Sequence, residues 1–122
     1  MRMIKEIITI SVSSSGTTGT TTKVVPSGRI VGMYFTVPTL DGVHTAKFQI
    51  ADYDNSALIY VPDTAVGSGT CASATTSILR PTTDSGEYYP LFCGINGVSV
   101  LVTVSTSQNS TDTYTLTLII ET

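Results

Sequence analysis

Apolar and polar residues alternate along most of this chain, and a period of two predicts β-strands rather than helices. The first alternating stretch covers residues 4–13. One of its faces is apolar and the other is mostly hydroxylated, with Ile8, Ile10 and Val12 on the first and Ile7, Thr9 and Ser11 on the second. No stretch of helical length shows the spacing of an amphipathic helix. The pattern therefore favours an all-β protein.

The same alternation predicts further strands. We expect them at residues 29–37, 43–52, 56–61, 75–79, 88–93, 98–105 and 113–121. In 29–37, one face should carry Val31, Met33, Phe35 and Val37 and the other Ile30, Gly32, Tyr34 and Thr36. The other inward positions should be Ala46, Phe48, Ile50, Val98, Val100, Val102, Val104, Tyr114, Leu116, Leu118 and Ile120. Residues 14–22 are either a loop or a polar edge strand, and 23–25 are expected to form a short strand.

Turn signals separate these strands. Asp54-Asn55 predicts a hairpin between the strands on either side of it, because both residue types favour turns. Residues 94–97 begin and end with Gly and predict a tight turn. Residues 106–112 are expected to close a hairpin between the last two strands. The segment 62–90 is the least regular part of the chain, with one short strand.

The fold class follows from the number and spacing of the strands. About eight antiparallel strands, separated by turns at intervals of roughly 8–12 residues, predict two packed sheets. A chain of 122 residues can bury a sufficient core without metals or cross-links. We therefore predict that residues 1–122 form a single β-sandwich domain, best described as jelly-roll-like.

Charged residues are scarce, since they make up 12% of the chain while a typical domain has about 25%. Ser and Thr take their place on the predicted outer faces. The centres of protein–protein interfaces are depleted of charge, so these neutral faces are suited to being covered by protein. The alternative, that Thr is frequent simply because it favours strands, stays open at this point.

Charge and hydropathy exclude two classes of partner. With a formal net charge of −3 and six singly scattered Lys and Arg residues, the chain has no basic stripe for nucleic acid. The longest apolar runs are of strand length, well short of the roughly 20 residues that cross a bilayer, so no membrane partner is expected. Residues 1–6 contain no apolar signal segment, so we expect the protein to stay in the compartment where it is made, unless it travels in an assembly.

No reaction is indicated by the residue types. His44 is the only histidine, and no Gly-x-Ser-x-Gly motif occurs. We therefore predict no catalytic residue, no enzymatic activity, no cofactor and no metal centre. Asp52, Asp54 and Asp63 superficially resemble a calcium loop, but the positions that require Gly and Glu hold Ala57 and Asp63. A turn explains these acids better, although a weak cation site near Asp52 and Asp54 is left open.

Cys71 and Cys93 are the only cysteines, and two states are open to them. A disulfide would stabilise the fold by about 3 kcal/mol in the loop-entropy model. Because the sequence shows no secretion signal, two reduced thiols are favoured.

The candidate partner-contact residues lie at strand ends or in the irregular segment: Arg80, Tyr88, Tyr89, Tyr53 and Tyr60. Tyr and Arg are enriched among the residues that dominate binding energy at interfaces. The alternative for each tyrosine is that it covers a sheet edge or the rim of the core. The first strand, or residues 114–122, could also pair with the edge of a neighbouring subunit.

Three stretches carry a resemblance to a known family: residues 7–13, the Ser/Gly/Thr tract after them, and residues 101–122. In texture the chain resembles small virion structural proteins of tailed bacteriophages, of the capsid-decoration, cement or head-fibre type. The resemblance implies a sandwich that is made in the host cytoplasm and then sits on the capsid surface, binding the major capsid protein or another virion protein. It also implies a homo-oligomer, with a trimer favoured.

The resemblance supplies no catalytic residues. The alternative function is a glycan- or receptor-binding module of a tail fibre or adhesin. The absence of Trp weighs against sugar binding, because sugar faces usually stack on exposed aromatic rings.

Overall fold

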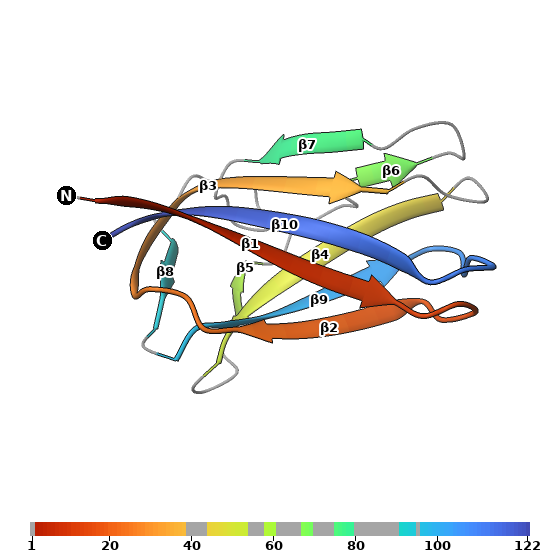
Figure 1. Ribbon diagram of the computed structural model, residues 1–122, viewed down its shortest axis with the longest axis horizontal. Helices are drawn as coiled ribbons and strands as arrows, with labels where there is room; N and C mark the ends of the chain where they lie inside the picture. Colours follow the sequence, from red (N-terminus) through yellow and green to blue (C-terminus); the bar gives the residue numbers. More distant parts are fainter. Residues whose placement is uncertain are drawn as a thin grey trace.

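The computed structural model describes residues 2–38, 44–53, 58–60, 67–69, 75–79, 91–94 and 96–122, and every structural statement below concerns these residues. They form ten strands (Figure 1). The strands are β1 (Met3–Val12), β2 (Thr18–Lys23), β3 (Gly28–Val37), β4 (His44–Asp52), β5 (Leu58–Tyr60), β6 (Gly67–Gly69), β7 (Thr75–Leu79), β8 (Leu91–Cys93), β9 (Val98–Val104) and β10 (Asp112–Glu121). In these ranges no helix is long and apolar enough to cross a membrane.

The strands form two antiparallel sheets that pack face to face (Figure 1). Sheet A has the order β1-β10-β3-β7, and β8 also pairs with β3. Sheet B has the order β2-β9-β4-β5, and β6 also pairs with β4. The predicted all-β sandwich is confirmed.

The outer edges of β3 and β4 each carry two short strands laid end to end. β7 pairs with the second half of β3 and β8 with its first residues, and both run antiparallel to it. β5 and β6 divide the edge of β4 in the same way. Counting each such pair as one interrupted strand gives eight strands. Numbered in chain order, sheet A then has the strand order 1-8-3-6 and sheet B the order 2-7-4-5. That is the double Greek-key order of a jelly roll.

The connection between the last two long strands differs from the prediction. β9 lies in sheet B between β2 and β4, whereas β10 lies in sheet A between β1 and β3. The loop that joins them therefore crosses from one sheet to the other, and the predicted hairpin is wrong. The predicted pairing of β4 with β5 is confirmed, while its turn residues Asp54 and Asn55 lie outside the described residues.

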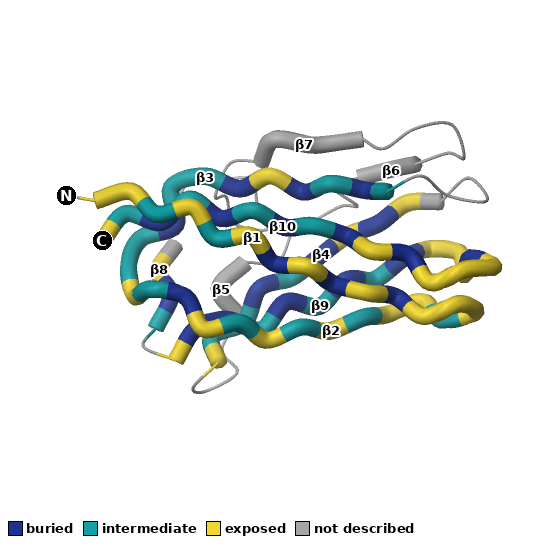
Figure 2. Tube along the Cα trace, in the orientation of Figure 1, coloured by how far each residue is buried: buried dark blue, intermediate teal, exposed yellow. Residues whose placement is uncertain are grey.

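The inward faces of both sheets form one apolar core, visible as the buried segments in Figure 2. Its larger members are Ile8, Ile10, Ile30, Met33, Phe35, Val37, Phe48, Ile50, Tyr114, Leu116, Leu118 and Ile120. Phe35 joins the two sheets, with its ring centroid 4.8 Å from that of Phe48 in sheet B and 6.1 Å from that of Tyr114 in sheet A. Burial raises the pKa of Tyr114 to about 12, and the charge of Asp112 adds to the effect. The inward positions predicted for β1, β4, β9 and β10 are confirmed.

A β-bulge changes the faces at the start of β3. Ile119 pairs with Gly32 but the next residue, Ile120, pairs with Ile30, so Val31 is the extra residue. A bulge shifts the alternation by one position. Ile30 is therefore buried, whereas strict alternation predicts it on the face opposite Met33 and Phe35.

Several shorter predictions have mixed outcomes. Most of the polar tract, from residue 18 onward, belongs to the edge strand β2, which confirms the second of the two alternatives for it. The separate strand predicted for 23–25 is wrong, because β2 ends at Lys23. β7 has its predicted bounds, and β8 covers the second half of the strand predicted at 88–93, whose first half lies outside the described residues. β6 was not predicted.

Cys93 is a free, buried thiol in the structure, whereas Cys71 lies outside the described residues. Its Sγ lies 3.1 Å from the carbonyl oxygen of Pro26 and 3.6 Å from that of Gly28. Burial raises the pKa of this thiol, with the charge of Asp52 adding to the rise. A thiol that is buried and kept protonated acts as a small apolar side chain.

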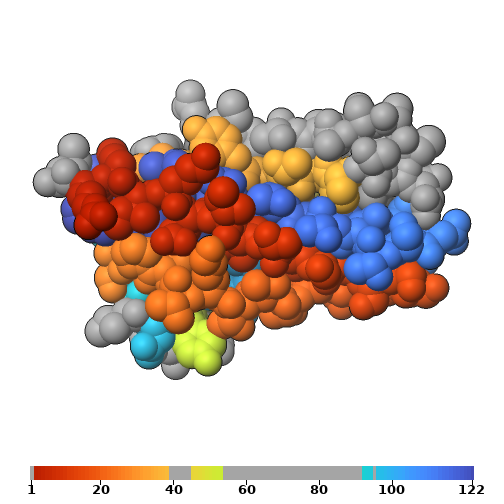
Figure 3. Space-filling model, viewed as in Figure 1, coloured from red at the N-terminus to blue at the C-terminus, as the bar shows by residue number. Residues whose placement is uncertain are grey.

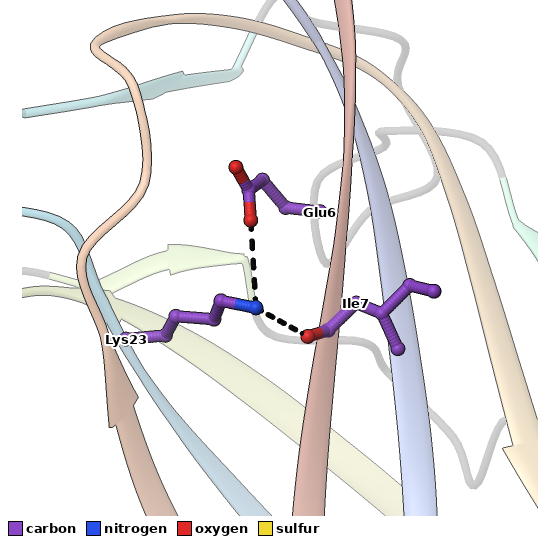
Figure 4. A network of polar contacts seen from close by, with 3 residues as sticks. All are labelled: Glu6, Ile7 and Lys23. Carbon is purple, nitrogen blue, oxygen red and sulfur yellow. Dashed lines mark hydrogen bonds and ion pairs between the residues drawn. The ribbon is translucent and has the colours of Figure 1, made fainter.

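Along one side of the sandwich the edge strands β1 and β2 meet, although they belong to different sheets. Lys23 Nζ donates to the carbonyl oxygen of Ile7 at 2.7 Å and lies 3.4 Å from Glu6 Oε2 (Figure 4). Thr21 Oγ1 donates to the carbonyl oxygen of Thr9 at 3.0 Å. We call this contact the β1–β2 seam, and define it as residues 6–11 of β1 with 19–23 of β2.

The seam narrows toward the connection between its two strands. Gly19 lies so close to β1 that a Cβ there would overlap the carbonyl oxygen of Ser11. The side chains that reach from β2 to β1 thus shorten in steps of two residues, from Lys23 to Thr21 to Gly19. Each successive side chain fits a narrower gap between the two sheets.

Candidate functional site

The outer face of sheet A exposes several large apolar side chains near the chain termini. Met3 is 55% exposed, Ile7 48%, Tyr34 37% and Phe92 63%. They come from β1, β3 and β8, and the half-buried Ile119 of β10 lies between them. We call these five residues the apolar end of sheet A. Figure 3 shows β1 and β10 side by side on this surface of the molecule.

Strand register places these side chains in neighbouring rows, because directly paired residues point to the same side of a sheet. The first row runs Met3, Glu121, Arg29 and Phe92 across the four strands. The next rows are Lys5, Ile119 and Gly32, and then Ile7, Thr117 and Tyr34. At least one large apolar residue therefore occurs in each of these three rows.

Two of the three charged side chains in these rows form an ion pair, and the third, Lys5, is exposed. Arg29 Nη2 lies 3.1 Å from Glu121 Oε1, and both side chains are partly exposed. Ile119 lies against Gly32, which has no side chain to cover it. The surface here combines exposed hydrocarbon with one internal ion pair, a composition that suits contact with another protein.

The rest of the sheet A outer face, in the part formed by β1, β10 and β3, is hydroxylated. Toward the β1–β2 connection, the rows are Thr9, Thr115 and Thr36, and then Ser11 and Thr113. The outer face of sheet B has the same character, with rows Thr22, Ser99 and Ala51, then Thr20, Leu101 and Gln49, then Thr18, Thr103 and Lys47. The apolar end of sheet A thus differs from the other outer surfaces that the structure describes.

A second candidate lies at the end of the sandwich where β2 and β4 finish. Tyr53, which is 54% exposed, and Val24, which is 78% exposed, border a hollow of about 220 Å³. Thr22, Lys23 and Asn96 complete its lining. The Tyr53 backbone N–H donates to the carbonyl oxygen of Gly97 at 3.1 Å, which anchors the main chain from which the ring projects. Drug-sized ligands usually occupy 300 Å³ or more, roughly, so this hollow suits one side chain or one sugar ring.

The structure places only part of the predicted contact set. Tyr53 is exposed at the end of β4. Tyr60 lies in β5, opposite Ile50, and its side chain is outside the described residues. Arg80, Tyr88 and Tyr89 are likewise outside them. Only Tyr53 of the five has a described side chain, so their assembly into one site stays a prediction.

The apolar end of sheet A was missed, although the sequence contained a signal for two of its members. Ile7 shares a strand face with Thr9 and Ser11, and Tyr34 shares one with Gly32 and Thr36. A large apolar residue on an otherwise hydroxylated face is the signal that could have identified them. Phe92 had no such signal, because β8 is too short to show alternation.

No cluster of at least three His, Cys, Asp or Glu side chains that could hold a metal ion occurs in the ranges that the structure covers. The cation site left open near Asp52 and Asp54 is not resolved by this observation, because Asp54 lies outside these ranges. His44 begins β4, and its side chain is also outside them.

No family model matches the sequence, and comparison with curated proteins gives no match. Among solved structures, the capsid of cyanophage Pam1 is 16% identical with a TM-score of 0.46, and the alignment covers 96% of this chain and 84% of that chain. Infectious bursal disease virus strain Gx gives 15% identity and a TM-score of 0.46 over 98% of this chain, which spans only 32% of that chain. The xylan-binding module CBM15 gives 10% identity and a TM-score of 0.48, with 93% and 78% covered.

All three TM-scores are below 0.5, and the identities are 16% or lower. The three matches also join proteins of different kinds, namely a virus, a phage capsid and a sugar-binding module. They therefore assign no function to this chain, because one fold hosts many functions. The identification of the jelly roll is based on the strand order described above.

Proposed function

We propose that this chain is a non-enzymatic structural protein of a phage virion, which binds the outside of the capsid and decorates or stabilises it. The observation that carries the proposal is the apolar end of sheet A. Its exposed side chains lie in neighbouring rows of the sheet and contribute little to the core. Contiguous exposed apolar surface on a folded domain marks sites of protein–protein contact.

The proposed partner is the major capsid protein or another protein of the capsid surface. The neighbouring outer surfaces of the sandwich present neutral hydroxyl groups, which can be covered by protein at a small cost in desolvation compared with charged groups. A capsid lattice also presents the same contact many times. Several weak contacts, made by a homo-oligomer such as a trimer, would then combine into firm attachment.

The test is co-sedimentation of the purified protein with phage capsids that lack it. In the test variant, Ile7, Tyr34 and Phe92 are all replaced by Thr, so that the apolar end takes on the character of the hydroxylated end. Because buried apolar anchors dominate interface energetics, we expect capsid binding to weaken by about thirtyfold or more. Thr favours strands, so the sandwich should be retained.

The matched control replaces Leu101 and Ala51 by Thr on the outer face of sheet B. This variant should bind capsids like the parent protein. Equal binding by all three proteins would contradict the proposal, and so would failure of the parent protein to bind any capsid.

Glycan binding is the second candidate, and the hollow beside Tyr53 is the observation that favours it. An exposed ring next to Thr22 and Asn96 offers both a stacking surface and polar groups to a sugar. The test is a glycan array with the parent protein and a Tyr53→Ala variant. Saturable binding that is lost in the variant would support this function over capsid attachment.

A further inference from the structure

β1 has one free edge, and its backbone parity can be read from the structure. Arg2 and Thr122 exchange two backbone hydrogen bonds at 3.3 and 2.9 Å. The even-numbered residues of β1 therefore bond to β10, while the N–H and C=O groups of its odd-numbered residues point away from β10. The second group comprises Met3, Lys5, Ile7, Thr9 and Ser11.

The β1–β2 seam covers only part of this edge. Lys23 binds the carbonyl oxygen of Ile7, Thr21 binds that of Thr9, and Gly19 lies against that of Ser11. The N–H and C=O groups of Met3 and Lys5 make no hydrogen bond to any residue that the structure describes. We call residues 2–6 the open edge of β1.

The charges around the open edge are unequal. Arg2 and Lys5 are exposed, and neither forms an ion pair within the described part of the chain. The two nearby carboxylates are already engaged, since Glu6 contacts Lys23 and Glu121 contacts Arg29. The open edge is therefore bordered by two cations whose charge is not locally neutralised.

We propose that the open edge of β1 accepts an extended acidic segment of another protein by strand addition. The segment would pair antiparallel to β1 through the main-chain groups of Met3 and Lys5, which is how an exposed strand edge recruits a partner. Two acidic side chains of the segment, three positions apart, would lie beside Lys5 on the outer face and beside Arg2 on the opposite face. Apolar side chains two positions before and two positions after the acid beside Lys5 would extend the contact over Ile7 and Met3 on the outer face.

A second copy of this chain fits the open edge less well. Antiparallel pairing of two β1 strands through residues 2–6 would place the two Lys5 side chains diagonally across the outer face, and would set Arg2 opposite a Glu6 that already contacts Lys23. Like charges placed across neighbouring strands are destabilising. Residues 114–122, the other segment suggested by the sequence for edge pairing, cannot act in this way because β10 has β1 on one side and β3 on the other.

The test uses the full ¹⁵N-labelled chain and two synthetic peptides, and it involves no capsid. One hexapeptide, Val-Thr-Asp-Val-Val-Asp, places its acids opposite Lys5 and Arg2 when it pairs antiparallel to residues 2–7, and the other has Lys in place of both Asp residues. We expect the acidic peptide to bind about tenfold more tightly, because charge complementarity discriminates between partners. Its binding should shift the backbone amide signals of Met3 and Lys5, and should slow their hydrogen exchange. A version of the acidic peptide with methylated backbone nitrogens should not bind.

Two variants make the test specific. Lys5→Glu should lose the preference for the acidic peptide or reverse it, whereas the matched control Lys47→Glu, on the outer face of sheet B, should behave like the parent chain. Equal binding of both peptides, unchanged signals at Met3 and Lys5, or formation of a dimer through β1 would overturn the proposal. Because capsids are absent from this test, its outcome is independent of the capsid experiment.

Discussion

The two ends of the β1–β2 seam join the same pair of strands by opposite means. At the narrow end, Gly19 allows the strands to approach so closely that no side chain fits between them. At the wide end, the long side chain of Lys23 spans the gap to the carbonyl oxygen of Ile7 and to Glu6 (Figure 4). Thr21 lies between them in position and in length.

This difference shows how the separation of the two sheets selects residues at their edges. A close backbone approach is rigid, because the carbonyl oxygen of Ser11 cannot move without moving β1. A flexible lysine can adjust to a change of spacing, and its contacts are partly exposed to water. Substitutions should therefore be costly at the narrow end and mild at the wide end.

The largest effect is expected for Gly19→Ala. The added Cβ would overlap the backbone of Ser11, so β1 and β2 would have to separate at the point where both continue into their connection. Overpacking of this kind costs about 1–3 kcal/mol, and we expect the upper part of that range. Urea denaturation gives the change in the free energy of unfolding. The control is Gly32→Ala on the outer face, where the nearest atom, Ile119 Cγ1, lies 3.3 Å away and can move. Equal losses of unfolding free energy in both variants would contradict a rigid contact between Gly19 and Ser11.

The second effect concerns the core behind the narrow end, where Tyr114 pairs with Ile10. Burial raises the pKa of Tyr114 from its ordinary value of 10.0 to about 12, so the folded state favours the neutral phenol. This contribution is complete below pH 10 and is lost as the pH rises through 12, by about 2 kcal/mol. Unfolding by urea at pH 8 to 11.5 should show a smaller loss of stability for Tyr114→Phe than for the parent chain. The same change at the exposed Tyr34 is the control, and an identical pH dependence in all three proteins would contradict the prediction.

Most strands and their inward faces were predictable, because alternation is a local signal. Ile8, Ile10 and the four valines of β9 are buried as expected. β6 was not predictable, since Gly67 to Gly69 form a strand only by pairing with β4 and have no apolar alternation of their own. The bulge at Val31 was missed for a related reason, because it is a mismatch between β3 and β10 rather than a property of β3 alone.

The candidate site depended even more on non-local register. Ile7 and Tyr34 stood out as apolar residues on hydroxylated faces, but their adjacency arises only because β10 lies between β1 and β3. The sequence suggested instead that β10 pairs with β9, which would have separated these residues. The β1–β2 seam likewise could not be predicted from alternation, because it joins strands from different sheets.

At the middle of the seam, Thr21→Val removes one hydrogen bond while conserving shape. The carbonyl oxygen of Thr9 would lose its donor, and because the contact is exposed, water can partly replace it. We expect a loss of about 1 kcal/mol in the free energy of unfolding, measured by urea denaturation. Thr20→Val is the matched control, since Thr20 points outward beside Leu101 and should change stability by less than about 0.5 kcal/mol. An equal change at both threonines would show that strand preference, and not the seam, sets the effect.

The smallest effect is expected at the wide end, where a double-mutant cycle of Lys23→Met and Glu6→Gln separates the two contacts of the lysine. The ion pair has both side chains partly exposed, 38% for Lys23 and 22% for Glu6, so its coupling energy should be about 0.5 kcal/mol. That coupling should fall toward zero in 1 M salt, because the screening length there is only about 3 Å. The contact with the carbonyl oxygen of Ile7 is a short hydrogen bond of 2.7 Å, so the part of the Lys23→Met loss that depends on it should persist in high salt. A loss that disappears entirely with salt would mean that Lys23 serves the seam only through Glu6, and the graded contact of β2 with the backbone of β1 would then end at Thr21.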